Sequence, residues 1–117
     1  MTQPRRGSAR RDNRPEKSES SRAIALQVLQ AVDARSAYAN LLLPRVLRDS
    51  SLEPRDKAFA TDLVYSTLRW RGLLDAVIEI AAARSLPSID DRTRDVLRLG
   101  AAQLLIIGVP VHAAVSA

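Results

Sequence analysis

Arginine is the residue type in this chain whose placement most clearly suggests chemistry. Residues 1–22 carry seven lysines and arginines against three acids, a net charge of +4 out of +5 for all 117 residues. Guanidinium groups at this density attract phosphate groups. The candidate phosphate contacts are Arg5, Arg6, Arg10, Arg11, Arg14 and Arg22 in this segment, and Arg69 and Arg71 farther along. The segment predicts a basic arm for nucleic acid; the alternative is a solubilising leader without a specific partner.

Groups that could catalyse a reaction are scarce. The chain has no cysteine, which excludes disulfides, thiolate metal sites and cysteine nucleophiles and is typical of intracellular proteins. His112 is the only histidine, so it has no second imidazole for a metal site. The carboxylates of Asp90 and Asp91 are adequately explained as acids at a helix N-terminus. The four glycines are isolated, and none forms a phosphate-binding loop. We expect neither an active site nor a bound cofactor or metal in this chain.

Residues 1–20 are predicted to be disordered, and residues 21–117 to form one helical domain. The first segment is rich in Arg, Ser, Pro and Gly and cannot bury enough apolar surface to fold. It also lacks the apolar core of a secretion signal. The most apolar run, Leu99–Val109, is well short of the ~20 residues that a membrane-spanning helix needs.

The remaining pattern predicts an all-α fold of five helices and a truncated sixth. Ser20 or Ser21 would cap the first helix, Pro44 would interrupt the second, and Gly72 would separate the third from the fourth. A capping box from Ser88 to Asp91 would begin the fifth. The expected helices are Arg22–Ala34, Ser36–Arg48, a central helix from Pro54 to the hinge at Gly72, Leu73–Ala83 and Asp90–Ile107. Gly108 ends the last of these, and Pro110 opens the truncated sixth helix.

Helical periodicity also predicts which side chains are buried. In the central helix the arc of Phe59, Ala60, Leu63, Val64, Thr67, Leu68 and Trp70 should face the core, while Arg55, Asp62 and Arg69 face outward. Trp70 is expected to be a core anchor, and the alternative is a platform on which an RNA base stacks. Elsewhere the expected core residues are Leu41, Leu42, Val46, Leu47, Leu73, Leu74, Val77, Ile78, Ile80 and Ala81. From Leu99 onward the fifth helix is apolar all round and should be enclosed, with Gly100 allowing another helix to approach closely.

Several motifs together resemble a known family. They are RAIALQVL (22–29), SAYANLLLPRVL (36–47), EPRDKAFATDLVYSTLRWRGLLDAVI (53–78) and RDVLRLGAAQLLIIGVPVHAAVSA (94–117). In order and spacing they are similar to the N-terminal NusB-like domain of the Sun/Fmu (RsmB-type) 16S rRNA cytosine-C5 methyltransferases. The resemblance covers Arg22–Ala117. The LRW motif at 68–70 and the proline in LLLPRVL favour this branch over the free NusB antitermination factors.

The resemblance implies an all-α bundle of two small subdomains and a cytoplasmic protein. It also implies a non-catalytic, RNA-binding accessory domain, which helps to position small-subunit rRNA for a catalytic domain absent from this chain. That catalytic domain would bind S-adenosylmethionine and would be the accessory domain's second partner. In the related antitermination factor the basic arm and the start of the first helix contact RNA, which by position points to Arg22 and the tail arginines. The alternatives are a module that binds a ribosomal or transcription protein, and a stand-alone antitermination factor.

Overall fold

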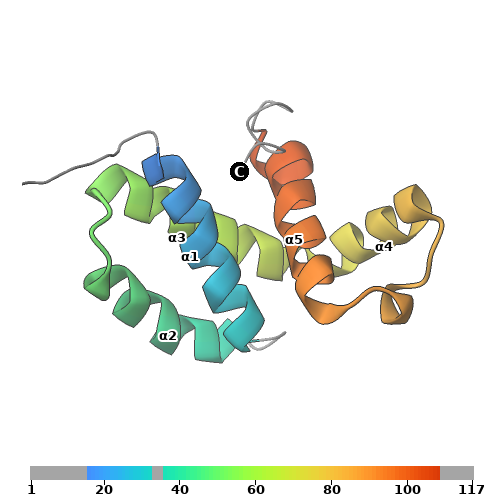
Figure 1. Ribbon diagram of the computed structural model, residues 1–117, viewed down its shortest axis with the longest axis horizontal. Helices are drawn as coiled ribbons and strands as arrows, with labels where there is room; N and C mark the ends of the chain where they lie inside the picture. The colour runs from blue at the N-terminus through green and yellow to red at the C-terminus, as the bar shows by residue number, and fades with distance from the viewer. Residues whose placement is uncertain (1–15, 33–35, 109–117) are drawn as a thin grey trace, which may run out of the picture.

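The computed structural model describes the backbone of residues 16–32 and 36–108, and this part of the chain is helical without any strand (Figure 1). The elements are α1 (Glu16–Val32), α2 (Ser36–Asp49), α3 (Pro54–Arg69), α4 (Arg71–Ala82), the 3₁₀ turn η2 (Leu86–Ser88), α5 (Asp91–Ala102) and the π-helical turn η3 (Gln103–Ile107). The predicted all-α class and its five helices are confirmed. The predicted sixth helix from Pro110 and His112 lie outside the described residues, as do residues 1–15.

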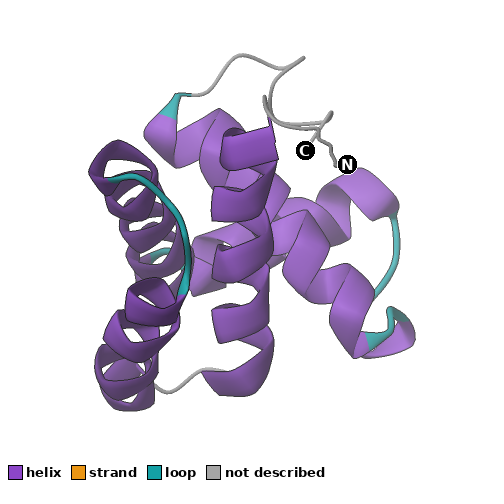
Figure 2. Cartoon of the chain, turned by 60° about the vertical axis from the view of Figure 1, so that its left-hand side comes forward, coloured by secondary structure: helices purple, strands orange, loops and turns teal. Residues whose placement is uncertain are grey.

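The helices form two groups. In one, α1 packs against both α2 and α3; in the other, α4 packs against α5 (Figures 1 and 2). The groups meet where α5 contacts α1 and α3, while α4 extends away from the first group (Figure 1). This arrangement agrees with the expectation of two small subdomains.

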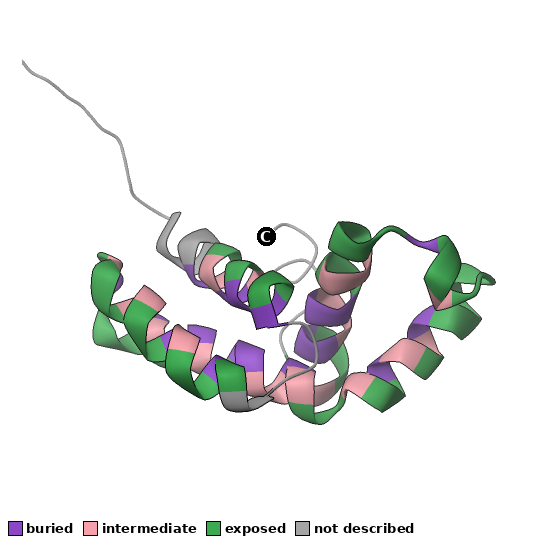
Figure 3. Cartoon of the chain, turned by 90° about the horizontal axis from the view of Figure 1, so that it is seen from below, coloured by how far each residue is buried: buried purple, intermediate pink, exposed green. Residues whose placement is uncertain are grey.

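The main core lies between α1, α2 and α3, and α5 adds Leu99 to it. Its α1 members recur at helical spacing, and the buried faces of the helices turn toward one another (Figure 3). The buried cluster is Ala25, Val28, Leu29, Val32, Ala39, Leu43, Leu63, Val64 and Leu99. Burying a leucine or valine side chain contributes about 1.5–3 kcal/mol, so this cluster supplies much of the driving force for folding.

Helix α1 begins earlier than predicted, at Glu16 instead of after a serine cap. Ser21 lies inside the helix and is fully buried, and its hydroxyl donates to the backbone oxygen of Asp56 in α3 at 3.1 Å. The prediction of Ser20 or Ser21 as the cap was therefore wrong. The Ser21 hydroxyl joins two helices instead of starting one.

Helix α2 runs without interruption through Pro44, which the sequence predicted to divide it. The proline is exposed and removes one internal donor, a cost that the flanking turns and the packing of α2 on the core offset. The buried face also differs from the prediction. Leu43 is 2% exposed and Leu41 is 71% exposed, whereas Leu42, Val46 and Leu47 are partly buried as expected.

Helices α3 and α4 meet at Trp70, two residues before the predicted hinge at Gly72. Trp70 has φ −101° and ψ 18°, outside the helical pattern of α3. Because the turn occurs there, its side chain leaves the predicted buried arc and is 43% exposed, so its assignment as a core anchor was wrong. Ala60, Leu63, Val64 and Thr67 are buried and Phe59 and Leu68 pack on the core, as predicted.

The α4–α5 group is less enclosed than predicted. Leu74 and Ile78 are buried, but Ile80 is 82% exposed. The other expected core residues exposed here are Leu73 and Ala81, and Leu104 and Leu105 in η3 are exposed where full enclosure was expected. A Cβ added to Gly100 would meet nothing within 4 Å, so none of the helices that the structure describes approaches closely there.

The ends of the elements follow simple capping rules. Pro54 is the first residue of α3, and Gly108 ends η3 with φ +86°, both as predicted. Asp90, not the predicted Ser88, caps α5: its carboxylate accepts from the Thr93 backbone N–H at 3.2 Å and from the Thr93 hydroxyl at 2.6 Å. These hydrogen bonds, the one from the hydroxyl foremost, hold the pKa of Asp90 below its ordinary value.

Candidate functional site

The junction of α3 and α4 presents the sequence Arg69–Trp70–Arg71. Arg69 is exposed and forms no ion pair with any residue in the described ranges. Arg71 is partly buried, and its Nε lies 4.0 Å from Oδ2 of Asp75, one turn along α4. The exposed indole of Trp70 separates the two arginines in the chain. This junction therefore combines an apolar aromatic surface with positive charge.

Arg22, predicted as a phosphate contact, is engaged within the fold. Its Nε donates to Oε1 of Gln103 in η3 at 2.7 Å. Its guanidinium lies 5.2 Å from the centroid of the Phe59 ring in α3, a distance typical of a cation–π interaction. Arg22 thereby connects α1 to both α3 and η3.

The structure does not bring Arg22 together with Arg69 and Arg71. Arg22 lies over Phe59 near the start of α3, whereas Arg69 is the last residue of that helix. The two positions on α3 are about 15 Å apart along the helix axis. The tail candidates Arg5, Arg6, Arg10, Arg11 and Arg14 lie outside the described residues, so their contribution stays a prediction.

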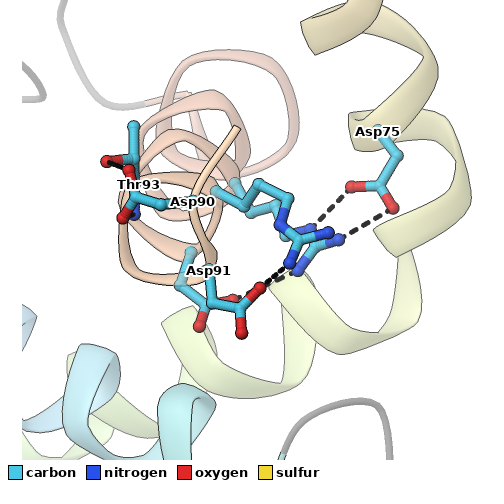
Figure 4. A network of polar contacts seen from close by, with 7 residues as sticks. Asp75, Asp90, Asp91 and Thr93 are labelled. Carbon is cyan, nitrogen blue, oxygen red and sulfur yellow. Dashed lines mark hydrogen bonds and ion pairs between the residues drawn. The ribbon is translucent and has the colours of Figure 1, made fainter. Parts of the chain in front are cut away.

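Sequence reasoning missed a buried arginine between α4 and α5. Arg98 is 6% exposed, and it donates from Nε to Oδ1 of Asp75 at 2.6 Å and from NH2 to Oδ2 of Asp75 at 3.1 Å. It also donates to Oδ1 of Asp95 at 3.2 Å. The carboxylate of Asp75, on α4, thus accepts two hydrogen bonds from Arg98 of α5 (Figure 4). Burial opposes the charge of Arg98, but the two carboxylates outweigh it and raise the pKa of the guanidinium.

The Arg98 network fixes the start of α4 and hence the junction. Asp75 lies one turn after Arg71, so anchoring Asp75 to α5 also holds the turn of α4 that carries Arg71. The spacing of Asp95 and Arg98 was a signal for the local contact, because residues three apart are neighbours on a helix. Only the fold shows that Asp75 completes it.

An apolar groove of about 1060 Å³ lies between α1, α4 and the α5–η3 segment. Val77, Ala81, Leu97, Gly100 and Leu104 are among its lining residues, and Arg22 and Gln103 are the polar ones. Such a surface accepts apolar side chains and offers little to a phosphate. It is chemically distinct from the α3–α4 junction.

Neither a metal site nor a membrane span is found in the described ranges. Within them, no three His, Cys, Asp or Glu residues lie close enough to hold a metal ion. No helix among the described residues has the length and apolar character required to cross a membrane.

Comparison with known proteins identifies the family. The model of the NusB family matches residues 19–117. The chain belongs to the NusB family. The predicted NusB-like bundle is thereby confirmed, and the resemblance deduced from the motifs at 22–29, 36–47, 53–78 and 94–117 is correct. No solved structure matches this NusB domain significantly.

The curated relatives are longer proteins. The putative methyltransferase Rv1407 of Mycobacterium tuberculosis is 52% identical over 116 residues, which is 99% of this chain and 24% of the relative. The ribosomal RNA small subunit methyltransferase B of Thermus thermophilus is 45% identical over 81% of this chain and 23% of its own length. A probable methyltransferase B of Synechocystis is 33% identical over 83% of the chain. This NusB domain thus spans about a quarter of the relatives it matches and corresponds to their N-terminal part.

Proposed function

We propose that this NusB domain is a non-catalytic, RNA-binding accessory domain of an rRNA (cytosine-C5) methyltransferase. The observation that carries the proposal is its 45% identity to a ribosomal RNA small subunit methyltransferase B, over most of the chain. In this proposal the domain binds small-subunit rRNA in the cytoplasm and helps to position it for the catalytic part of the longer protein.

The charges of the chain support an RNA partner. Residues 1–22 hold most of the net positive charge. Arg45, Arg48, Arg55 and Arg69 are exposed on α2 and α3 without an ion pair to a described residue. Exposed guanidinium groups can exchange their counterions for RNA phosphates. Arg22 has a structural role in addition, so the proposal depends mainly on the tail and Arg69.

S-adenosylmethionine belongs to the remainder of the longer protein in this proposal. The described residues form no β-strand and no glycine-rich loop, which are the features that usually bind the phosphate or ribose of a nucleotide-like cofactor. What this domain would contribute is contact with the RNA and with the catalytic domain.

The experiment is a titration of a fluorescein-labelled small-subunit rRNA hairpin with the full chain, followed by anisotropy at several salt concentrations. We expect the logarithm of affinity to fall linearly with the logarithm of salt, by about 0.7–0.9 per phosphate neutralised. A variant with glutamine at positions 5, 6, 10, 11 and 14 should bind more weakly and with a shallower slope. Affinity that depends neither on salt nor on these arginines would contradict the proposal.

A protein-interaction role is the second candidate, because the apolar groove between α1, α4 and α5 can accept apolar side chains. A domain of this kind would bind the catalytic domain or a ribosomal or transcription protein through the groove. The affinity of the domain for such a partner would change little with salt. A titration of the partner protein at the same salt concentrations would therefore distinguish this role from RNA binding.

A further inference from the structure

The indole of Trp70 is exposed to water, and the backbone that carries it is held in place. The residue is 43% exposed although it lies between two helices. Its backbone N–H donates to the Ser66 oxygen at 3.1 Å, and its backbone oxygen accepts from the Leu74 N–H at 2.9 Å. Both sides of the residue are therefore held by helical hydrogen bonds. A side chain presented from a rigid backbone loses less freedom when a ligand covers it.

Positive charge lies next to this ring in the chain. Arg69 precedes Trp70, is exposed and has no ion pair with a described residue. Arg71 follows it and stays near Asp75, whose carboxylate is also bound by Arg98. At the junction, the guanidinium of Arg69 can therefore donate hydrogen bonds to a phosphate, and the next residue in the chain, Trp70, offers an apolar π face.

This pairing has a specific chemical meaning. Unpaired bases of RNA stack on aromatic side chains, while neighbouring arginines bind the phosphates of the same strand. The exposed aliphatic residues of α4, Leu73 and Ile80, have no π face and could not do this. We propose that Trp70 is a stacking platform for an unpaired RNA base and that Arg69 binds an adjacent phosphate. The inference rests on the proposed RNA-binding function and adds to it a site and a preference for single-stranded segments.

Trp70 is the only tryptophan of the chain, so its fluorescence reports on this site alone. The probe is an unlabelled, uridine-rich RNA decamer that is titrated into the full chain. The same decamer with a fluorescein label is used in a parallel titration to measure anisotropy. We expect tryptophan fluorescence to be quenched with the same midpoint as the anisotropy change. A fully paired RNA duplex of equal length should quench less at equal occupancy.

Substitutions separate the ring from the charge. Trp70→Ala should weaken binding of the decamer about tenfold, since stacking on one aromatic ring is worth that order of affinity, and Trp70→Phe should retain most of it. Arg69→Gln should reduce the salt slope by about 0.7, one phosphate on a single strand. Arg92→Gln at the start of α5 is the matched control: it removes the same charge from an exposed site outside the junction and should leave the quenching intact. Thermal unfolding of each variant is measured as the control for loss of the fold.

The outcomes distinguish this inference from the function on which it rests. RNA binding seen by anisotropy with unquenched Trp70, or with unchanged affinity in Trp70→Ala, would overturn the platform and leave the proposed function standing. No binding of any RNA would overturn both. A shift of tryptophan emission that depends on protein concentration without RNA would show that another protein surface covers the ring, and would also overturn the platform.

Discussion

The group of α1, α2 and α3 and the pair of α4 and α5 are stabilised by different interactions. The first is held by fully buried aliphatic side chains such as Val28, Leu43 and Leu63. The second places a buried arginine between its helices and leaves Leu73 and Ile80 exposed. The difference teaches that an apolar stripe predicts burial only where another helix covers the side to which it points. Substitutions in both groups of helices test this contrast.

Leu63→Ala should have the largest effect. Leu63 is completely buried in α3 within the α1–α2–α3 core, and removing its side chain leaves a cavity as well as losing apolar burial. The expected loss of stability is about 3 kcal/mol. Urea unfolding followed by circular dichroism measures it.

The control for Leu63→Ala is Ile80→Ala, a comparable truncation at a residue that is 82% exposed in α4. It should change stability by less than about 0.5 kcal/mol. If the two substitutions cost the same, the contrast between the two groups of helices is wrong, because Ile80 would then be covered in solution.

Arg98→Ala should have an intermediate effect, about 2 kcal/mol, because it leaves the carboxylates of Asp75 and Asp95 without their buried cation. A double-mutant cycle with Asp75→Asn measures the coupling between the two side chains from four unfolding free energies. We expect a coupling of about 1 kcal/mol or more. Additive effects would mean that Arg98 contributes only packing. The α4–α5 pair would then be stabilised by apolar burial, like the group of α1, α2 and α3.

Gly72→Ala should have a small effect of the opposite sign. Gly72 lies in the first turn of α4, and an added Cβ would meet nothing within 4 Å. Alanine loses less backbone entropy on folding, so stability should rise by about 0.5 kcal/mol, measured by thermal unfolding. A loss of stability would indicate that the junction needs glycine after all, as the sequence first suggested.

Much of the fold could be predicted from local patterns. The buried arc of α3, Pro54 at its start and Gly108 at the end of η3 follow from periodicity and capping, which depend on residues close in the chain. The motifs at 22–29, 36–47, 53–78 and 94–117 also identified the family correctly. The periodicity and the caps depend only on near neighbours, and the family resemblance depends on the order and spacing of motifs along the chain, so neither needs a contact between distant residues.

The errors concern features that depend on distant residues. Pro44 is tolerated inside α2 because packing on the core offsets a lost hydrogen bond, and Trp70 is exposed because the helix turns there and not at Gly72. Arg22 and Arg98 both read as surface arginines in the sequence. Their partners Gln103 and Asp75 lie on other helices, so only the fold could reveal them.

The π-helical turn at the end of α5 bears on how related sequences should be aligned. The Gly108 N–H donates to the Gln103 oxygen at 2.9 Å, so this turn holds one residue more than an α-helical turn. A relative that lacks one residue between Gln103 and Ile107 would thus keep the same α5 with an ordinary α-turn after it. In an alignment with such a relative, the gap would fall within this turn and not in α5 around Arg98.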